Sequence, residues 1–266
     1  MLAATSRLRA AVPARLIVTL LAVLAAMALM VTACSSDTDK AADQPHQLSV
    51  FAASSLTDAF TQLGDQFTAA HPSVNVAFDF AGSNDLVTQL QQGAPADVLA
   101  TADTASMGDA GTLVGKPVTF AGNKLAIAVE PGNPQRITSL ADLARKGLKV
   151  VLAAPEVPAG KYAQEALGKA GVSVTPVSLE VSVKGVVTKI SLGEADAGIV
   201  YVTDVDAAKG KIDGVAIPGD QNVVASYPIA TVKGGTYPDD ASAFMDYVLS
   251  DEGQKVLADN GFLPAP

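Results

Sequence analysis

The side chains that act most often as nucleophiles, general bases or metal ligands are scarce in this chain. Among its 266 residues are two histidines, His46 and His71, and one cysteine, Cys34. Neither histidine has a spacing that suits metal ligation or a nucleophile–base pair. The sequence contains no nucleophile elbow, Walker loop or dinucleotide-binding glycine motif. These features disfavour an enzyme, and we expect no cofactor.

Two further chemistries have weak support. The paired carboxylates at 239–240 and 251–252 lie near expected helix starts, where acidic side chains compensate the helix dipole. Sugar binding is disfavoured because the chain has no tryptophan and only 5% aromatic residues, which leaves few surfaces on which a sugar ring can stack.

Four junctions at which small residues lead into an expected helix are the strongest chemical signal. The first-turn N–H groups of a helix have no partner within the helix and lie at the positive end of its dipole. Where such junctions follow strands of an open α/β sheet, they favour the binding of an anion. In the first junction, Ser55 is expected to cap its helix, with Asp58 as the capping partner. The four junctions lie at 52–58, 81–86, 158–162 and 181–185.

The elements around these junctions alternate between short β-rich runs and helical stretches. Strands are expected at 48–51, 74–80, 97–100, 125–129, 149–153, 198–201 and 227–232. Helices are expected at 56–70, 86–91, 162–170, 186–192 and 241–257. Apolar positions 56, 60, 63 and 67 predict one buried face, and the last helix is expected to turn inward Phe244, Tyr247, Val248 and Val256. The alternation predicts an α/β fold with mostly parallel sheets.

Residues 1–33 have the features of a lipoprotein signal peptide. Three arginines precede an uncharged stretch at 16–33, which ends beside Cys34. Small residues followed by cysteine resemble the lipobox of bacterial lipoproteins, in which the signal is cleaved and the cysteine is acylated. An uncleaved transmembrane anchor is the alternative, because the uncharged stretch is close to the roughly 18 residues that span a bilayer. We expect export and lipid anchoring to the outer face of the cytoplasmic membrane, with 34–47 as a flexible tether.

The charge of the chain limits its partners. Without residues 1–33, which contain three arginines and no acid, the chain would keep 15 basic and 27 acidic residues, a net charge of −12. Nucleic acid is disfavoured as a partner because phosphate binding depends on clustered lysine and arginine. An anion would therefore be held by local dipoles and not by the overall field.

Four segments together resemble the periplasmic molybdate-binding proteins of ABC importers. They are VFAASSL at 50–56, GAPADV at 93–98, PEVPAG at 155–160 and GIVY at 198–201, and their order and spacing match across essentially all of 48–266. The resemblance implies a two-lobed type II periplasmic-binding-protein fold, with a mostly parallel sheet and flanking helices in each lobe and the ligand in the cleft between them. Lobe I would hold 48–121 and 228–266, and lobe II would hold 122–227. The chain would cross between lobes near 120–125 and return near 225–229.

The same resemblance implies how the ligand is held. The ligand-binding residues, carried over position by position, are Ser55, Ser83, Ala159, Val183 and Tyr201. The two serines would each offer a hydroxyl and a backbone N–H, Ala159 and Val183 a backbone N–H, and Tyr201 its phenol. Molybdenum would be held as molybdate through its oxygens, with no direct bond between protein and metal. The expected partners are this oxyanion and a permease subunit in the membrane, and the protein is expected to be a monomer.

A site built only of donors would select among anions by protonation. Phosphate keeps a proton at neutral pH that molybdate lacks, and burying that proton without an acceptor costs about 1–3 kcal/mol. Sulfate has no proton, so only cavity size separates it from molybdate, and tungstate is nearly the size of molybdate. Near the predicted donors, Asp85 is expected to face solvent and cap its helix. Lys184 either helps to neutralise the ligand or is a solvated first-turn lysine.

The main prediction is thus a lipoprotein that captures molybdate, and tungstate with it, and delivers the anion to an ABC transporter. Three alternatives stay open. They are a binder of sulfate or another oxyanion, an exported enzyme that acts on anionic substrates, and an adhesion or scaffold lipoprotein without a small ligand. The enzyme is disfavoured because the sequence provides no base near Ser55 or Ser83.

Overall fold

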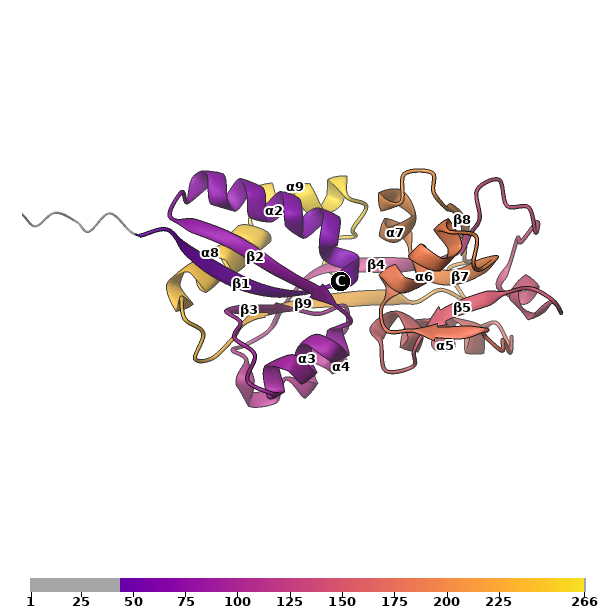
Figure 1. Cartoon of the computed structure of the whole chain (residues 1–266), viewed down its shortest axis with the longest axis horizontal. Coiled ribbons are helices and arrows are strands. Elements are labelled where there is room, and N and C mark those ends of the chain that lie inside the picture. The colour runs from indigo at the N-terminus through magenta and orange to yellow at the C-terminus, as the bar shows by residue number, and fades with distance from the viewer. Residues whose placement is uncertain (1–43, 266) are drawn as a thin grey trace, which may run out of the picture. The chain divides into compact units, whose positions relative to one another are not determined.

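The computed structural model describes residues 44–265, in which strands and helices alternate along the chain (Figure 1). The first half contains β1 His46–Ala53, η1 Ser54–Leu56, α2 Thr57–Ala70, β2 Val74–Ala81, α3 Ser83–Gln91, β3 Val98–Ala100, α4 Thr104–Asp109, η2 Gly111–Leu113 and β4 Val118–Val129. The second half contains η3 Leu140–Ala144, β5 Val150–Ala153, α5 Pro158–Lys169, β6 Ser178–Glu180, α6 Val183–Ser191, β7 Ala197–Tyr201, α7 Val202–Ala207, β8 Asp213–Ala216, β9 Val224–Thr231, α8 Pro238–Leu249 and α9 Asp251–Asp259.

The strands of the described chain pair into one sheet with the order β2-β1-β3-β9-β4-β7-β5-β6, and β8 pairs with β4 outside this path. β1 is parallel to β2 and β3, and β5 is parallel to β6 and β7. All pairings of β4 and β9 are antiparallel. The predicted α/β fold class is therefore confirmed, with parallel strands at both ends of the sheet and antiparallel strands between them.

Two strands connect two groups of elements, which we call lobe I and lobe II (Figure 1). Lobe I contains β1, β2 and β3 with helices α2, α3, α4, α8 and α9, and lobe II contains β5 to β8 with α5, α6 and α7. β4 pairs with β9 through 118–124 and with β7 from Leu125 onward, while β9 also pairs with β3. Both strands thus run from one lobe into the other. The residue boundaries given above for the lobes stay a prediction.

One face of α2 forms the centre of the lobe I core. The four positions predicted to be buried are all fully buried, and they are Leu56, Phe60, Leu63 and Phe67. The ring centroid of Phe60 lies 5.6 Å from that of Phe120 in β4, and that of Phe67 lies 5.3 Å from that of Phe244 in α8. Burying a side chain of this size contributes about 1.5–3 kcal/mol relative to leaving it exposed. The cluster therefore holds α2 against a connecting strand and against the carboxyl-terminal helices.

Three helices begin three or four residues earlier than their apolar spacing predicts. α3 begins at Ser83 and not at 86, α5 at Pro158 and not at 162, and α6 at Val183 and not at 186. The predicted starts are wrong because the first turns consist mainly of small or polar residues, which do not continue the apolar stripe. As a consequence, the junctions at 81–86, 158–162 and 181–185 contain the first turns of these helices.

The single helix predicted at 241–257 is also wrong, because the chain breaks into α8 and α9 at Ser250. This residue has an extended backbone, with φ −69° and ψ 164°, and its Oγ accepts a hydrogen bond from Gly253 N at 3.1 Å. A Cβ at Gly253 would lie 2.2 Å from the carbonyl oxygen of Tyr247, so the close approach of the two helices requires glycine. Tyr247 is half-buried: its hydroxyl donates to Gln66 Oε1, and its ring packs against the core, with its centroid 5.9 Å from that of Phe67. The acidic pairs do lie in the first turns of these helices, as predicted.

The amino-terminal predictions fall largely outside the described residues. These are the signal peptide at 1–33, the acylated Cys34 and most of the tether at 34–47. The last two tether residues, His46 and Gln47, belong to β1. Between residues 44 and 265, no helix is long and apolar enough to cross a membrane.

Candidate binding site

All five predicted ligand residues line one cavity, which we call the small cavity. Ser55 and Ser83 come from lobe I, and Ala159, Val183 and Tyr201 come from lobe II. Tyr201 is the last residue of β7 and the other four follow strands, so all five lie at the carboxyl ends of strands, where open α/β sheets bind their ligands. The cavity is small. The centre of a water-sized sphere can occupy about 10 Å³ of it, so there is room for one small group between the lobes.

The other residues of the small cavity are small or apolar. They are Ala53, Ser54, Ala81, Gly82, Ala102, Val157 and Pro158. Among the described residues that line it, none is charged. Short side chains let a ligand approach the backbone closely. Because no carboxylate of the described residues lines the cavity, a bound anion would contact hydrogen-bond donors and apolar groups and no negative charge.

Ser55 does not cap its helix, and this part of the prediction is wrong. A 3₁₀ turn separates β1 from α2, so Leu56 becomes the residue before α2 and no side chain caps it. The Ser55 Oγ instead lies 2.9 Å from the phenol oxygen of Tyr227 in β9. This bond holds the Ser55 hydroxyl at the edge of the cavity and joins η1 to a strand that connects the lobes.

Ser83 is the first residue of α3 and is almost fully buried. Its Oγ accepts a hydrogen bond from the backbone N–H of Ala102 at 3.0 Å. A hydroxyl that accepts a bond in this way keeps its own proton for donation. The loop after β3 therefore orients Ser83 as a donor.

Tyr201 ends β7 and is fully buried. Its phenol oxygen has no hydrogen-bond partner among the described residues, although it lies at the small cavity. Burial and the neighbouring phenol of Tyr227 raise the pKa of Tyr201 well above its usual range, so the group stays a neutral O–H donor. A buried hydroxyl without a partner costs about 1–3 kcal/mol, and an acceptor in the cavity would recover this free energy.

Ala159 and Val183 are the second residue of α5 and the first residue of α6. The backbone N–H groups of a first helical turn have no acceptor within the helix. Both side chains are buried and apolar, so only the backbone can contribute a polar contact. A Cβ at Gly160 would lie 2.1 Å from the carbonyl oxygen of Ala154, so glycine allows the start of α5 to approach the end of β5 closely.

The two charged neighbours singled out in the sequence lie outside the lining of the small cavity. Asp85 is half-buried, its Oδ1 accepts from Asn84 Nδ2, and no side chain caps α3, so the predicted cap at Asp85 is wrong. The Lys184 ammonium lies 3.2 Å from Asp58 Oδ2 and 3.7 Å from Asp204 Oδ1. Asp204 and Tyr227 were not predicted from the sequence, because no local pattern relates either residue to the site.

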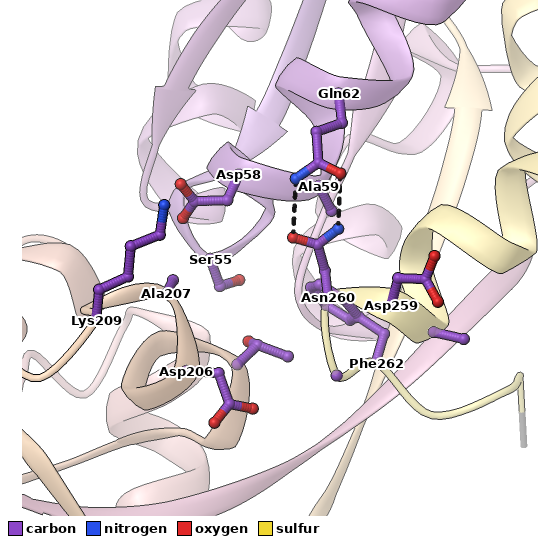
Figure 2. Close-up of a pocket in the computed structure, with 13 residues that line it drawn as sticks. Ser55, Asp58, Ala59, Gln62, Asp206, Ala207, Lys209, Asp259, Asn260 and Phe262 are labelled. Carbon is purple, nitrogen blue, oxygen red and sulfur yellow. Dashed lines mark hydrogen bonds between the residues drawn. The ribbon is translucent and has the colours of Figure 1, made fainter.

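A second cavity of about 320 Å³ shares Ser55 with the first. Figure 2 shows the residues that line this second cavity. We call it the large cavity. Asp58 and the Gln62–Asn260 amide pair line its lobe I side, and Asp206 and Lys209 line its lobe II side. With Asp259 it contains three carboxylates against one ammonium. A dianion would be repelled there, although the space is much larger.

Comparison with known proteins relates nearly the whole described chain to one class. Residues 48–263 match a protein family described as bacterial extracellular solute-binding protein. The molybdate-binding protein ModA of Mycobacterium tuberculosis is 46% identical over 216 residues, which cover 80% of this chain and 83% of that protein. The molybdate-binding protein ModA of Escherichia coli is 32% identical over 232 residues, with coverages of 81% and 88%.

Solved structures show the same fold at lower identity. The periplasmic molybdate-binding protein of Azotobacter vinelandii matches with a TM-score of 0.72 and 20% identity, covering 82% of this chain and 100% of that chain. The sulfate-binding protein SubI of Mycobacterium tuberculosis matches with a TM-score of 0.71 and 20% identity, with coverages of 82% and 86%. At this identity the two structures are evidence for the fold alone.

Proposed function

Because the chain belongs to the bacterial extracellular solute-binding proteins, we propose that it captures molybdate and delivers the anion to the permease of an ABC importer. The observation that carries this proposal is the small cavity, where three helix starts, two serines and one unpartnered phenol meet without a charged side chain. Relatives that cover most of this chain are named for molybdate binding, which supports the choice of anion.

The electrostatics of the small cavity suit a dianion. Each helix start carries roughly half a positive charge, so α3, α5 and α6 together offset most of two negative charges. Hydrogen bonds from neutral donors to a charged acceptor contribute about 1.5–3 kcal/mol each. No counter-cation is needed, and the anion is held by its oxygens with no bond between the protein and molybdenum.

The size of the cavity indicates a closed arrangement of the lobes. About 10 Å³ is room for one water-sized sphere, whereas a tetrahedral anion with four oxygens is larger. Binding would therefore hold the lobes slightly further apart than in this structure, with donors of both lobes on the anion.

Several finer properties belong to the same proposal. The protein is exported, anchored through an acylated Cys34, monomeric and without enzymatic activity or cofactor. Tungstate binds in the place of molybdate, because both are unprotonated tetrahedral dianions of nearly the same size. Phosphate is disfavoured by its proton, because no carboxylate among the described residues that line the cavity can accept it.

Titration calorimetry of the purified protein, stripped of bound anions, tests this function. Molybdate and tungstate are expected to bind, sulfate to bind more weakly and phosphate not to bind. A protein that prefers sulfate would keep the site and change its ligand. A protein that binds none of the four anions would contradict the proposed function.

A further inference from the structure

We propose that Asp204 and Lys184 form a positioning pair that holds the two lobe II donors, Val183 and Tyr201, in one arrangement, and that Asp58 of lobe I engages this pair when the lobes close. The inference rests on the proposed function, since it concerns the same donors. None of the three charged residues lines the small cavity.

Asp204 fixes the Tyr201 side of the site. It is the third residue of α7 and is 1% exposed. Its Oδ2 accepts a hydrogen bond from the backbone N–H of Tyr201 at 3.1 Å. Tyr201 carries the phenol that lacks a partner, so this bond sets the backbone from which the phenol reaches the cavity.

The other oxygen of Asp204 faces the start of α6. Its Oδ1 has no hydrogen-bond partner among the described residues and lies 3.7 Å from Lys184 Nζ. Lys184 directly follows Val183, whose backbone N–H is the proposed donor. One buried carboxylate therefore reaches both the β7–α7 junction and the first turn of α6.

A buried charge is costly unless a partner compensates it. Burial raises the pKa of Asp204 to about 6, against the opposing effects of Lys184 and of the hydrogen bond from the Tyr201 N–H. The titratable groups that act on Asp204 are Lys184 from α6, Asp58 from α2 and the phenols of Tyr201 and Tyr227. Because burial of this carboxylate costs free energy, Asp204 fits a role in positioning the donors better than a role in stabilising the fold.

Asp58 connects this pair to lobe I. Lys184 Nζ donates to Asp58 Oδ2 at 3.2 Å, and Asp58 lies in the first turn of α2. Separation of the lobes would break this contact and leave the contact with Asp204 intact. A second ion pair between the lobes, Lys161 with Asp103 at 3.6 Å, contacts neither α6 nor α7 and provides a matched control.

The decisive variant is Asp204→Asn, which keeps an oxygen for the Tyr201 N–H and removes the charge that faces Lys184. We expect molybdate affinity to fall about tenfold, while the melting temperature of the ligand-free protein at pH 7 stays equal or rises. A merely structural carboxylate would instead lower the melting temperature. Unchanged affinity in Asp204→Asn would overturn the proposal.

Substitutions of Lys184 and Asp58 separate the contact within lobe II from the contact between the lobes. Lys184→Met is expected to weaken binding about as much as Asp204→Asn, and Lys184→Arg to stay within about threefold of the wild type, because a guanidinium can contact both carboxylates. Asp58→Asn and the control Lys161→Met are expected to raise the dissociation rate only about twofold to fivefold, because each replaced side chain is more than half exposed and solvent screens its charge. If Lys184→Arg weakened binding as much as Lys184→Met does, the role of the positive charge would be contradicted.

A measurement without ligand keeps this inference separate from the proposed function. Amide hydrogen exchange of ligand-free Asp204→Asn is expected to be about tenfold faster than in the wild type at the start of α6. If the wild type bound no oxyanion, the function would fail and this measurement would still decide on the pair. Equal exchange in both proteins would overturn the pair.

Discussion

The small and large cavities share Ser55 and lie side by side between the lobes, yet they are built from different kinds of residue. The small cavity is surrounded by helix starts, serines and a phenol. The large cavity is surrounded by three carboxylates, one lysine and an amide pair (Figure 2). The larger space is the poorer site for an anion. We therefore propose the small cavity as the anion site from the sign of the surrounding dipoles and charges, and not from volume.

The difference follows from which parts of the chain form each cavity. The small cavity lies where strands of both lobes end and helices begin, so it is surrounded by first turns whose N–H groups have no acceptor within their helix. The large cavity lies along α2, α7 and the end of α9, where solvated side chains cover the helices. Substitutions at and behind the two cavities are expected to have effects of very different size.

Val183→Pro is expected to have the largest effect on binding. Val183 is the first residue of α6, where proline is well tolerated, and Ser182 before it has the extended backbone that precedes proline readily. The variant should therefore fold but lack the N–H donor, and molybdate affinity should fall about 10- to 150-fold. Calorimetry checks this, with Val183→Ala as the control that changes only the side chain. Weak binding by the alanine variant would contradict a backbone role.

The pH dependence of stability is expected to report the buried carboxylate behind the small cavity. Because the pKa of Asp204 is raised from 3.8 to about 6, the folded protein keeps this proton at a pH where the unfolded chain has lost it. Stability from this group is therefore lost as pH rises from about 4 to about 6, by up to about 3 kcal/mol. Urea unfolding should show Asp204→Asn gaining stability relative to the wild type across this window. A difference that does not vary with pH would contradict the assignment.

Tyr201→Phe is expected to move binding and stability in opposite directions. The variant removes a buried hydroxyl that has no partner in the ligand-free protein, so the free energy of unfolding should stay equal or rise by about 1 kcal/mol. Molybdate affinity should fall about tenfold, because a donor to the anion is lost. Thermal unfolding with and without molybdate measures both. A variant that is less stable and binds normally would show that the Tyr201 hydroxyl stabilises the core and does not bind the anion.

Lys209→Met is expected to have the smallest effect. Lys209 lines the large cavity and not the small one, so its loss should change molybdate affinity by less than about twofold. The same titration measures it. Loss of binding in this variant would indicate that the anion binds in the large cavity, and it would contradict the assignment of the anion to the small cavity.

The sequence predicts the fold class and the identity of most elements, because the apolar spacing of α2 and the β-rich runs are strong local signals. It predicts the helix starts poorly, since Ser83, Ala159 and Val183 lie in first turns without an apolar stripe. The break at Ser250 was hidden because apolar residues continue on both sides of it. These errors share one cause, which is that capping and close packing are not visible in periodicity.

In the candidate site, too, one part could be predicted from the sequence and another could not. The five residues that line the small cavity follow from a resemblance of ordered segments, and their ligand role stays a prediction. The contacts behind them cannot be predicted locally. Ser55 meets Tyr227 from 172 positions away, and Lys184 meets Asp58 from 126 positions away. Such pairs depend on how the connecting strands bring the two lobes together.

The most direct test of the anion site is a crystal structure of the protein with tungstate, located by its anomalous scattering. We predict one tungsten position in the small cavity, with oxygens in hydrogen-bond contact with Ser55, Ser83, Tyr201 and the starts of α5 and α6. A tungsten position in the large cavity beside Lys209, or none between the lobes, would contradict this account.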